Sequence, residues 1–139
     1  MKYYHFTSKR HLQEIQESGV IKTTCSNLLP PDPDTLKIVD GKARDKNWNY
    51  RQVVWLTNQI KPNSKELGLS RASESKTAVR LTIDTDKVAN VKRWKHFADE
   101  AKMDNNWRKR LESHGKPSTW FVVESEIPLD CVSAIDILE

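Results

Sequence analysis

His5 occupies a position in this sequence that favours ligand chemistry. It lies in the short aromatic segment Tyr3–Thr7, which predicts a strand, and a helix is expected directly after it. An imidazole there can donate to a sugar hydroxyl, and backbone amides at a helix start favour anions such as phosphate. The alternative is a partly buried histidine with a structural role. His5 is therefore a candidate ligand residue that neighbouring elements must position.

The first 24 residues predict a strand, a helix and a second strand. Residues 8–18 have helical spacing of apolar positions, Ser8 can cap the start of this helix, and Gly19 can end it. Residues 20–24 then predict a short strand. Later strands are expected at residues 52–58, 77–84, 119–127 and 132–138, and helices at residues 93–103 and after a cap at Asp104. Strands and helices in this order are typical of an α+β fold.

Length and composition predict one domain spanning residues 1–139. The chain is 37% hydrophobic and 30% charged, which suits a globular protein with a charged surface. Without a long apolar run or the apolar region of a signal peptide, we expect no membrane partner and a cytoplasmic location. No Cys and His residues have zinc-ligand spacing, so no metal is expected. The net charge of +4 permits an acidic partner such as nucleic acid but does not require one.

Three motifs carry a resemblance to a known fold family. They are Tyr4-His5-Phe6-Thr7 with the helix and residues 19–27 after it, Val54-Trp55-Leu56-Thr57, and residues 120–128 with the closing strand. In order and approximate spacing the chain resembles the ADP-ribosyltransferase-like domains of the diphtheria toxin and poly(ADP-ribose) polymerase superfamily. The resemblance implies a split antiparallel β-sheet core with a few short helices, a cleft between its halves, and NAD as the cofactor.

The resemblance also implies roles for residues of the first two core strands. The histidine of the first strand contacts the nicotinamide ribose in such families, which implies His5 on a ribose hydroxyl with Phe6 and Thr7 beside it. Thr57 or Trp55 would flank the nicotinamide, where an aromatic ring can stack on a flat cationic group. Many relatives have glycine directly after the histidine, and Phe6 leaves less room for close backbone approach.

Three more polar residues are expected at the cofactor. Arg80 lies on the polar face of its strand and could pair with the diphosphate, or with a carboxylate such as Glu124 across the sheet. Ser26 and Asn27 follow the second strand, where they could bond the cofactor or simply form a turn.

Glu124 and Glu126 are the candidate catalytic carboxylates. Several branches of the family have the catalytic glutamate at the start of the penultimate strand, and Thr119 or Trp120 occupies that place here. A regular strand would project the two glutamates to one side, similar to the Glu-x-Glu element of the arginine-modifying branch. Such a carboxylate would hold the ribose 2′-hydroxyl and stabilise oxocarbenium-like charge as nicotinamide leaves. The alternative is two solvated glutamates at a strand end.

Two main functions follow from these patterns. One is an NAD-dependent mono-ADP-ribosyltransferase that modifies a protein or nucleic acid; it requires the strands of His5, Thr57 and Glu124 to converge on one cleft, with residues 25–50 as a lid. The other is a catalytically inert module on the same fold that binds a nucleotide or nucleic acid. Residues 92–95 and 107–110 mix tryptophan with basic residues, as nucleic-acid sites do, although solvated helix faces are the favoured explanation. A transferase that removes a 2′-phosphate from RNA is a weaker third hypothesis.

Overall fold

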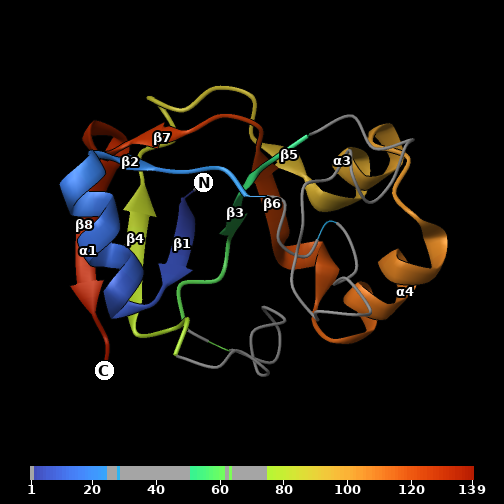
Figure 1. Cartoon of the computed structure of the whole chain (residues 1–139), viewed down its shortest axis with the longest axis horizontal. Coiled ribbons are helices and arrows are strands. Elements are labelled where there is room, and N and C mark those ends of the chain that lie inside the picture. The colour runs from blue at the N-terminus through green and yellow to red at the C-terminus, as the bar shows by residue number, and fades with distance from the viewer. Residues whose placement is uncertain (1, 25–27, 29–50, 62, 64–74) are drawn as a thin grey trace.

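The structure is a mixed α+β arrangement built on antiparallel sheets (Figure 1). It is a computed structural model that describes residues 2–24, 28, 51–61, 63 and 75–139. Six strands form the main sheet in the order β5-β6-β3-β1-β4-β8, and β2 pairs with β7 in a second sheet. The strands are β1 (Tyr3–Thr7), β2 (Val20–Ile21), β3 (Val54–Thr57), β4 (Val79–Ile83), β5 (Lys92–Arg93), β6 (Trp120–Val123), β7 (Ile127–Pro128) and β8 (Val132–Ile137). The helices are α1 (Lys9–Ser18), α3 (Trp94–Glu100) and α4 (Asn105–Ser113), with short 3-10 turns at Pro117–Thr119 and Leu129–Cys131.

Two hydrophobic cores lie on opposite faces of the main sheet. On the α1 face, Leu12 and Ile15 of the helix pack in one core with alternate residues of β3, β4 and β6, among them Leu81. On the α3 face, Trp94 of α3 packs with Trp120 of β6 in the other core. Side chains alternate between the faces along each strand, so the strand register decides which core a residue joins. Figure 1 shows α1 at one end of the sheet and α3 and α4 at the other.

The pairing between β1 and β3 is much shorter than the pairing of either strand with its other neighbour. β1 and β3 share the registered pair Tyr4–Thr57, whereas β1 pairs with β4 along its whole length from Tyr3 to Thr7. β3 likewise pairs with β6 along all four of its residues. The main sheet therefore consists of two well-paired halves, β1-β4-β8 and β3-β6-β5, that meet at a narrow junction.

The expected helix caps are confirmed. The Ser8 hydroxyl accepts a hydrogen bond from the His11 backbone N–H, and Gly19 ends α1 with a φ of 76°, a conformation that glycine adopts without strain. The Asp104 carboxylate accepts from the Trp107 backbone N–H at 2.9 Å and caps α4. The first helix thus begins directly after β1, as the sequence predicts.

The single strand expected over residues 119–127 is wrong. Residues 117–119 form a 3-10 turn, β6 ends at Val123 opposite Val54, and the chain bends at Glu124 and Ser125. Ile127 then pairs with Ile21 in the second sheet. The chain bends because it leaves one sheet and joins another, so Glu124 and Glu126 do not lie on a regular strand.

One strand of the structure was not predicted, and one predicted segment falls outside the described residues. β5 was not expected, because a two-residue strand carries no periodicity to read. Except for Leu28, the predicted lid at residues 25–50 lies outside the described residues, as do Ser26 and Asn27. Within the described ranges, no helix is long and apolar enough to cross a membrane.

Candidate functional site

His5 donates a hydrogen bond across the junction between the two halves of the sheet. Its Nδ1 lies 2.7 Å from the backbone carbonyl oxygen of Trp55. A carbonyl oxygen only accepts, so Nδ1 carries the proton and Nε2 of the neutral ring is an acceptor. Burial lowers the pKa of His5 below its ordinary value, and the bond to the Trp55 carbonyl offsets this only in part. A neutral His5 would therefore accept a hydrogen bond from a sugar hydroxyl through Nε2, rather than donate one as expected.

A polar cluster lies at the start of α1, close to His5. His11 Nδ1 lies 3.1 Å from the Ser8 hydroxyl and 3.1 Å from Lys76 Nζ. The charge of His11 contributes to the lowered pKa of His5, so the two imidazoles are near enough to interact. Sequence reasoning gave His11 and Lys76 no role. The three-residue spacing from Ser8 to His11 is a local signal for part of this cluster, but Lys76 comes from a distant segment.

His5 and Thr57 do not converge on one side of the sheet, which corrects the expectation. Thr57 is paired with Tyr4, so the two project to the α3 face, and His5, as the next residue, projects to the α1 face with its partner Leu81. Thr57 is buried, and its hydroxyl accepts from the Gln59 backbone N–H at 3.1 Å. Neighbouring residues of a strand project to opposite faces of the sheet. The register of β1 against β3 therefore decides whether His5 and Thr57 share a face, and the sequence does not reveal that register.

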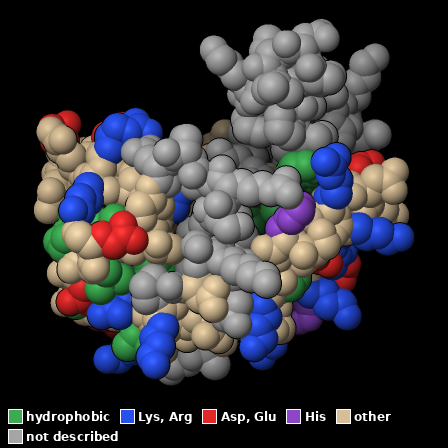
Figure 2. Space-filling model, turned by 90° about the horizontal axis from the view of Figure 1, so that it is seen from below, with side chains coloured by type: hydrophobic (Ala, Val, Ile, Leu, Met, Phe, Trp, Pro, Cys, Tyr) green, Lys and Arg blue, Asp and Glu red, His purple; other side chains and the backbone are tan. Residues whose placement is uncertain are grey.

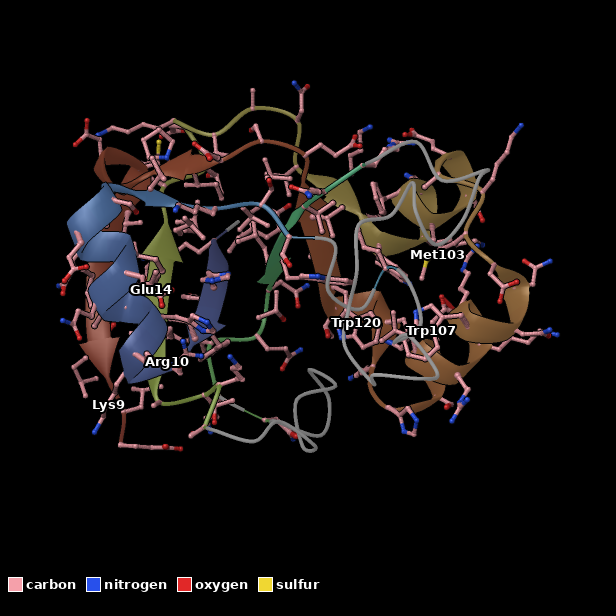
Figure 3. The ribbon with its side chains drawn as sticks, in the orientation of Figure 1. Lys9, Arg10, Glu14, Met103, Trp107 and Trp120 are labelled. Atoms are coloured by element: carbon pink, nitrogen blue, oxygen red, sulfur yellow. The ribbon has the colours of Figure 1, made fainter. Side chains whose placement is uncertain are left out.

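Trp55 belongs to an aromatic cluster on the α3 face and does not line a site with His5. Its ring centroid lies 4.9 Å from that of Trp94 and 6.0 Å from that of Trp120. Figure 3 shows Trp120 and Trp107 in the same region, between β6 and the helices. The Trp55 ring therefore stabilises packing on the α3 face, and its backbone carbonyl accepts the hydrogen bond from His5.

The residues expected beside His5 are buried in the sheet. Phe6 shares the α3 face with Arg80, its partner on β4, and Thr7 shares the α1 face with Val79. Phe6 and Thr7 are both buried, so neither side chain is open to solvent. Of the two, only Thr7 projects to the same face as His5.

Arg80 forms a cross-strand ion pair, which was the alternative to a diphosphate contact. Its partner is Asp136 and not Glu124. Its Nη2 lies 3.2 Å from the Asp136 carboxylate on β8, and Nη1 donates to the Ile60 carbonyl at 2.9 Å. The guanidinium carbon also lies 6.0 Å from the centroid of the Tyr4 ring. The Nε atom is buried without a hydrogen-bond partner. These contacts keep Arg80 on the α3 face, away from the face of His5.

Glu124 belongs to an ion-pair network formed with Arg51, Lys92 and Glu100. Its carboxylate accepts from Arg51 Nη2 and from Lys92 Nζ, each at 2.9 Å, and Arg51 Nε donates to the other oxygen. Lys92 and Arg51 also contact Glu100 of α3, at 2.9 and 3.1 Å. The hydrogen bond from Arg51 is the main reason that the pKa of Glu124 is lowered to about 2. Both carboxylate oxygens are therefore engaged on the side of the sheet that carries α3.

Glu126 does not share a site with Glu124. It is exposed beyond the bend and lines a small surface pocket with Lys87, Asn90 and Cys131. The contacts of Glu126 therefore do not support its expected role beside Glu124 in catalysis. Within the described ranges, no group of three or more His, Cys, Asp or Glu side chains is arranged to hold a metal ion.

The tryptophans of the two basic segments both contact the core on the α3 face. Trp94 is fully buried, so its ring is no open platform for a base, and Trp107 is half-buried and packs against the same core. Figure 2 shows Lys and Arg side chains at several places around the end of the molecule that carries α3 and α4. The burial of Trp94 agrees with the favoured explanation of solvated helix faces, whereas Trp107 is only half-buried.

Comparisons with models of protein families, with curated proteins and with solved structures found no match to this chain. The resemblance to ADP-ribosyltransferase-like domains therefore depends on the three sequence motifs.

Proposed function

We propose that this chain is a nucleotide-binding module on an ADP-ribosyltransferase-like fold, and that it holds NAD or a similar nucleotide at His5 without turning it over. The observation that carries the proposal is the hydrogen bond from His5 Nδ1 to the Trp55 carbonyl. This bond selects one tautomer and orients Nε2 as an acceptor, which is what recognition of a ribose hydroxyl requires. The narrow junction between β1 and β3 also agrees with the split sheet that the resemblance implies.

The cluster at the start of α1 supports the phosphate part of such a ligand. Lys76 Nζ lies 3.1 Å from His11 Nδ1, in the first turn of the helix. A cation next to a helix N-terminus favours a phosphate group. A ribose on His5 with a phosphate near Lys76 would use both features on the α1 side of the sheet.

The engagement of Glu124 argues against turnover. Stabilising an oxocarbenium-like ribose requires a carboxylate oxygen that can approach the sugar. Both oxygens of Glu124 are instead bonded to Arg51 and Lys92. Freeing the Glu124 oxygens would break these ion pairs, and Arg51 and Lys92 would keep only their contacts with Glu100 from this network.

The test is NAD binding by calorimetry in the wild type, His5→Asn and His96→Asn. The Asn amide can still donate to the Trp55 carbonyl, so His5→Asn retains the strand junction but lacks Nε2. We expect NAD affinity to fall at least about tenfold in His5→Asn, the effect of one lost hydrogen bond of about 1.4 kcal/mol. His96, exposed on α3, is the matched control and should leave affinity unchanged. Equal affinity in His5→Asn would contradict the proposal.

A second candidate, the mono-ADP-ribosyltransferase, retains one favourable observation. The low pKa of Glu124 keeps its carboxylate charged at neutral pH, as ribose holding requires. The discriminating assay follows NAD hydrolysis and transfer of labelled ADP-ribose to proteins and nucleic acids. Turnover by the wild type that is lost in Glu124→Gln, with NAD affinity retained, would favour the transferase and overturn the inert module.

A further inference from the structure

The positive charge of this chain is concentrated in one segment. Residues 92–116, which contain α3 and α4, hold eight Lys and Arg against four Asp and Glu, a formal net charge of +4. The whole chain also carries +4, from 23 basic and 19 acidic residues. The rest of the chain therefore holds fifteen residues of each sign and is neutral. An anionic partner would be attracted to residues 92–116 and not to the chain in general.

Arg108 links α4 to α3 and engages two of the four acidic residues. Its Nη1 donates to the Asp99 carboxylate of α3 at 2.6 Å, and its Nε donates to the Glu112 carboxylate at 3.0 Å. The same Glu112 oxygen accepts from the indole N–H of Trp94 at 2.9 Å. These bonds hold the two helices side by side at the end of the sheet away from α1 (Figure 1). Asp99 and Glu112 therefore both have partners within the protein.

The other two acidic residues of the segment are engaged as well. Glu100 of α3 accepts from Lys92 Nζ at 2.9 Å, and Asp104 accepts from the Trp107 backbone N–H as the cap of α4. Lys92 and Arg108 are the two half-buried cations of the segment, and between them they bind three of the four carboxylates. Each acidic residue thus already has a partner that is not one of the exposed cations.

Six cations of the segment are exposed and form no ion pair with any other residue that the structure describes. We call them the basic surface: Arg93, Lys95, Lys102, Lys109, Arg110 and Lys116. The bond with Arg108 is the main reason that the pKa of Asp99 is lowered, and the charge of Lys95 adds to this effect. Lys95 therefore lies near the bridge that joins α3 to α4, and Lys102 lies in the connection between the two helices.

The cations of α4 lie on its exposed face. At 100° per residue, Lys109 lies about 160° around the helix from the buried Leu111, and Arg110 lies about 100° from it. Asn106 and Ser113 lie between the two cations on the same face, and both are exposed. Amide and hydroxyl groups beside cations are the groups that donate to phosphate oxygens in nucleic-acid complexes.

We propose that the basic surface binds a nucleic-acid duplex through its phosphate backbone. A duplex presents phosphates in regular succession, and cations from both helices and from their connection can neutralise several of them at once. Each such contact releases counterions from the duplex, which favours binding at low salt. The basic surface is separate from the proposed nucleotide site, because His5 projects to the α1 face and α3 packs on the other face of the sheet.

The choice of a duplex follows from the chemistry of the same segment. Its aromatic rings are buried at Trp94 and Phe97 and half-buried at Trp107, so no fully exposed ring offers the stacking platform that a single strand uses. In the described part of the chain, the exposed large apolar side chains all lie outside residues 92–116. The basic surface therefore has no apolar anchor of the kind that inserts into a membrane or forms the centre of a protein interface. Charge with polar donors fits a phosphate backbone whose bases are already stacked on one another.

The test is fluorescence anisotropy of a labelled mixed-sequence DNA duplex, measured between about 50 and 200 mM salt. We expect the wild type to bind with an affinity that falls steeply as salt rises. The double variant Lys109→Gln with Arg110→Gln should weaken binding at least about tenfold and reduce the slope of log affinity against log salt by about two, since each phosphate contact contributes about 0.9. Lys95→Gln tests the α3 side independently and should reduce the slope by about one. Circular dichroism would verify that the variants retain the fold.

The matched control removes the same two charges from the other end of the molecule. Lys9 and Arg10 form an exposed Lys-Arg pair on α1 (Figure 3), and Lys9→Gln with Arg10→Gln should leave affinity for the duplex nearly unchanged. The exchange Lys109→Arg with Arg110→Lys retains the charge of α4 and should retain binding.

Four outcomes would overturn the proposal. They are a wild type that does not bind the duplex at low salt, an equal weakening by the α1 control, a loss of binding in the charge-retaining exchange, and a single strand of the same length bound more tightly than the duplex. Binding to phosphatidylserine vesicles in place of the duplex would be a case of the first outcome and would identify a membrane surface as the partner.

Discussion

The imidazole Nδ1 of His5 and the backbone carbonyl oxygen of Trp55 lie 2.7 Å apart, and this bond links β1 to β3 beside their registered pair. The side chain thus supplies a contact between the two halves of the sheet where backbone pairing is short. The same bond fixes the ring orientation and leaves Nε2 as the acceptor. One residue therefore combines a structural contact with the proposed ligand contact, and the variants that separate these roles are the informative ones.

Stability should decrease below about pH 6.5 because of His5. Its pKa is lowered in the folded state by burial, so the unfolded chain takes up a proton first as the pH falls. The contribution of the neutral ring is complete above the unfolded pKa and is lost as the pH falls toward the folded pKa. Urea unfolding of the wild type and His5→Asn at several pH values between 5 and 8 measures this effect. The difference in unfolding free energy between the two proteins should shrink toward acid pH; a constant difference would contradict the assignment.

Glu124 should contribute to stability at neutral pH through its ion pairs. The pKa of Glu124 falls from an unfolded value near 4.5 to about 2. The contribution is therefore present above pH 4.5 and is lost as the pH falls from there toward 2. Glu124→Gln should lower the unfolding free energy at pH 7 by about 1–2 kcal/mol, less than the full shift implies because the carboxylate is partly exposed. Glu126→Gln is the matched control without these pairs, and an equal effect of the two substitutions would count against the network.

Features that depend on neighbouring residues were predictable from the sequence. The Ser8 cap, the Gly19 terminus and the alternation in β4 each involve residues a few positions apart. Their physics is local, so the expected elements and the observed ones agree closely. The overall α+β class followed from the order of these elements.

The errors concern contacts between distant parts of the chain. The face of Thr57 relative to His5 depends on the register of β1 against β3, and a change of one residue reverses it. The partners of Glu124 come from Arg51, Lys92 and Glu100, which no spacing in the sequence connects to it. The bend after β6 depends on Ile21, which draws Ile127 into the second sheet.

Gly19→Ala should destabilise the protein by about 1 kcal/mol, because Gly19 has a φ of 76° that alanine adopts only with strain. A Cβ at this position would meet no atom within 4 Å, so crowding adds nothing to the cost. Thermal unfolding measures the change. Gly19→Asn should recover part of the loss, since asparagine tolerates this conformation better, and a loss as large as that of alanine would argue against backbone strain as the cause.

Trp55→Phe should distinguish the packing role of the Trp55 side chain from the hydrogen-bonding role of its backbone carbonyl. The indole packs against Trp94 and Trp120 on the α3 face, whereas the carbonyl that accepts from His5 belongs to the backbone and is retained in the variant. We therefore expect a loss of about 1–2 kcal/mol in unfolding free energy, typical of a reduced aromatic side chain in a packed cluster, with no change in NAD affinity. Trp107→Phe, in the same core but on α4, is the matched control for the packing effect. Calorimetry with NAD together with urea unfolding checks both parts. A large fall in NAD affinity for Trp55→Phe but not for Trp107→Phe would mean that the indole contacts the nucleotide, and the site would then have to include the α3 face.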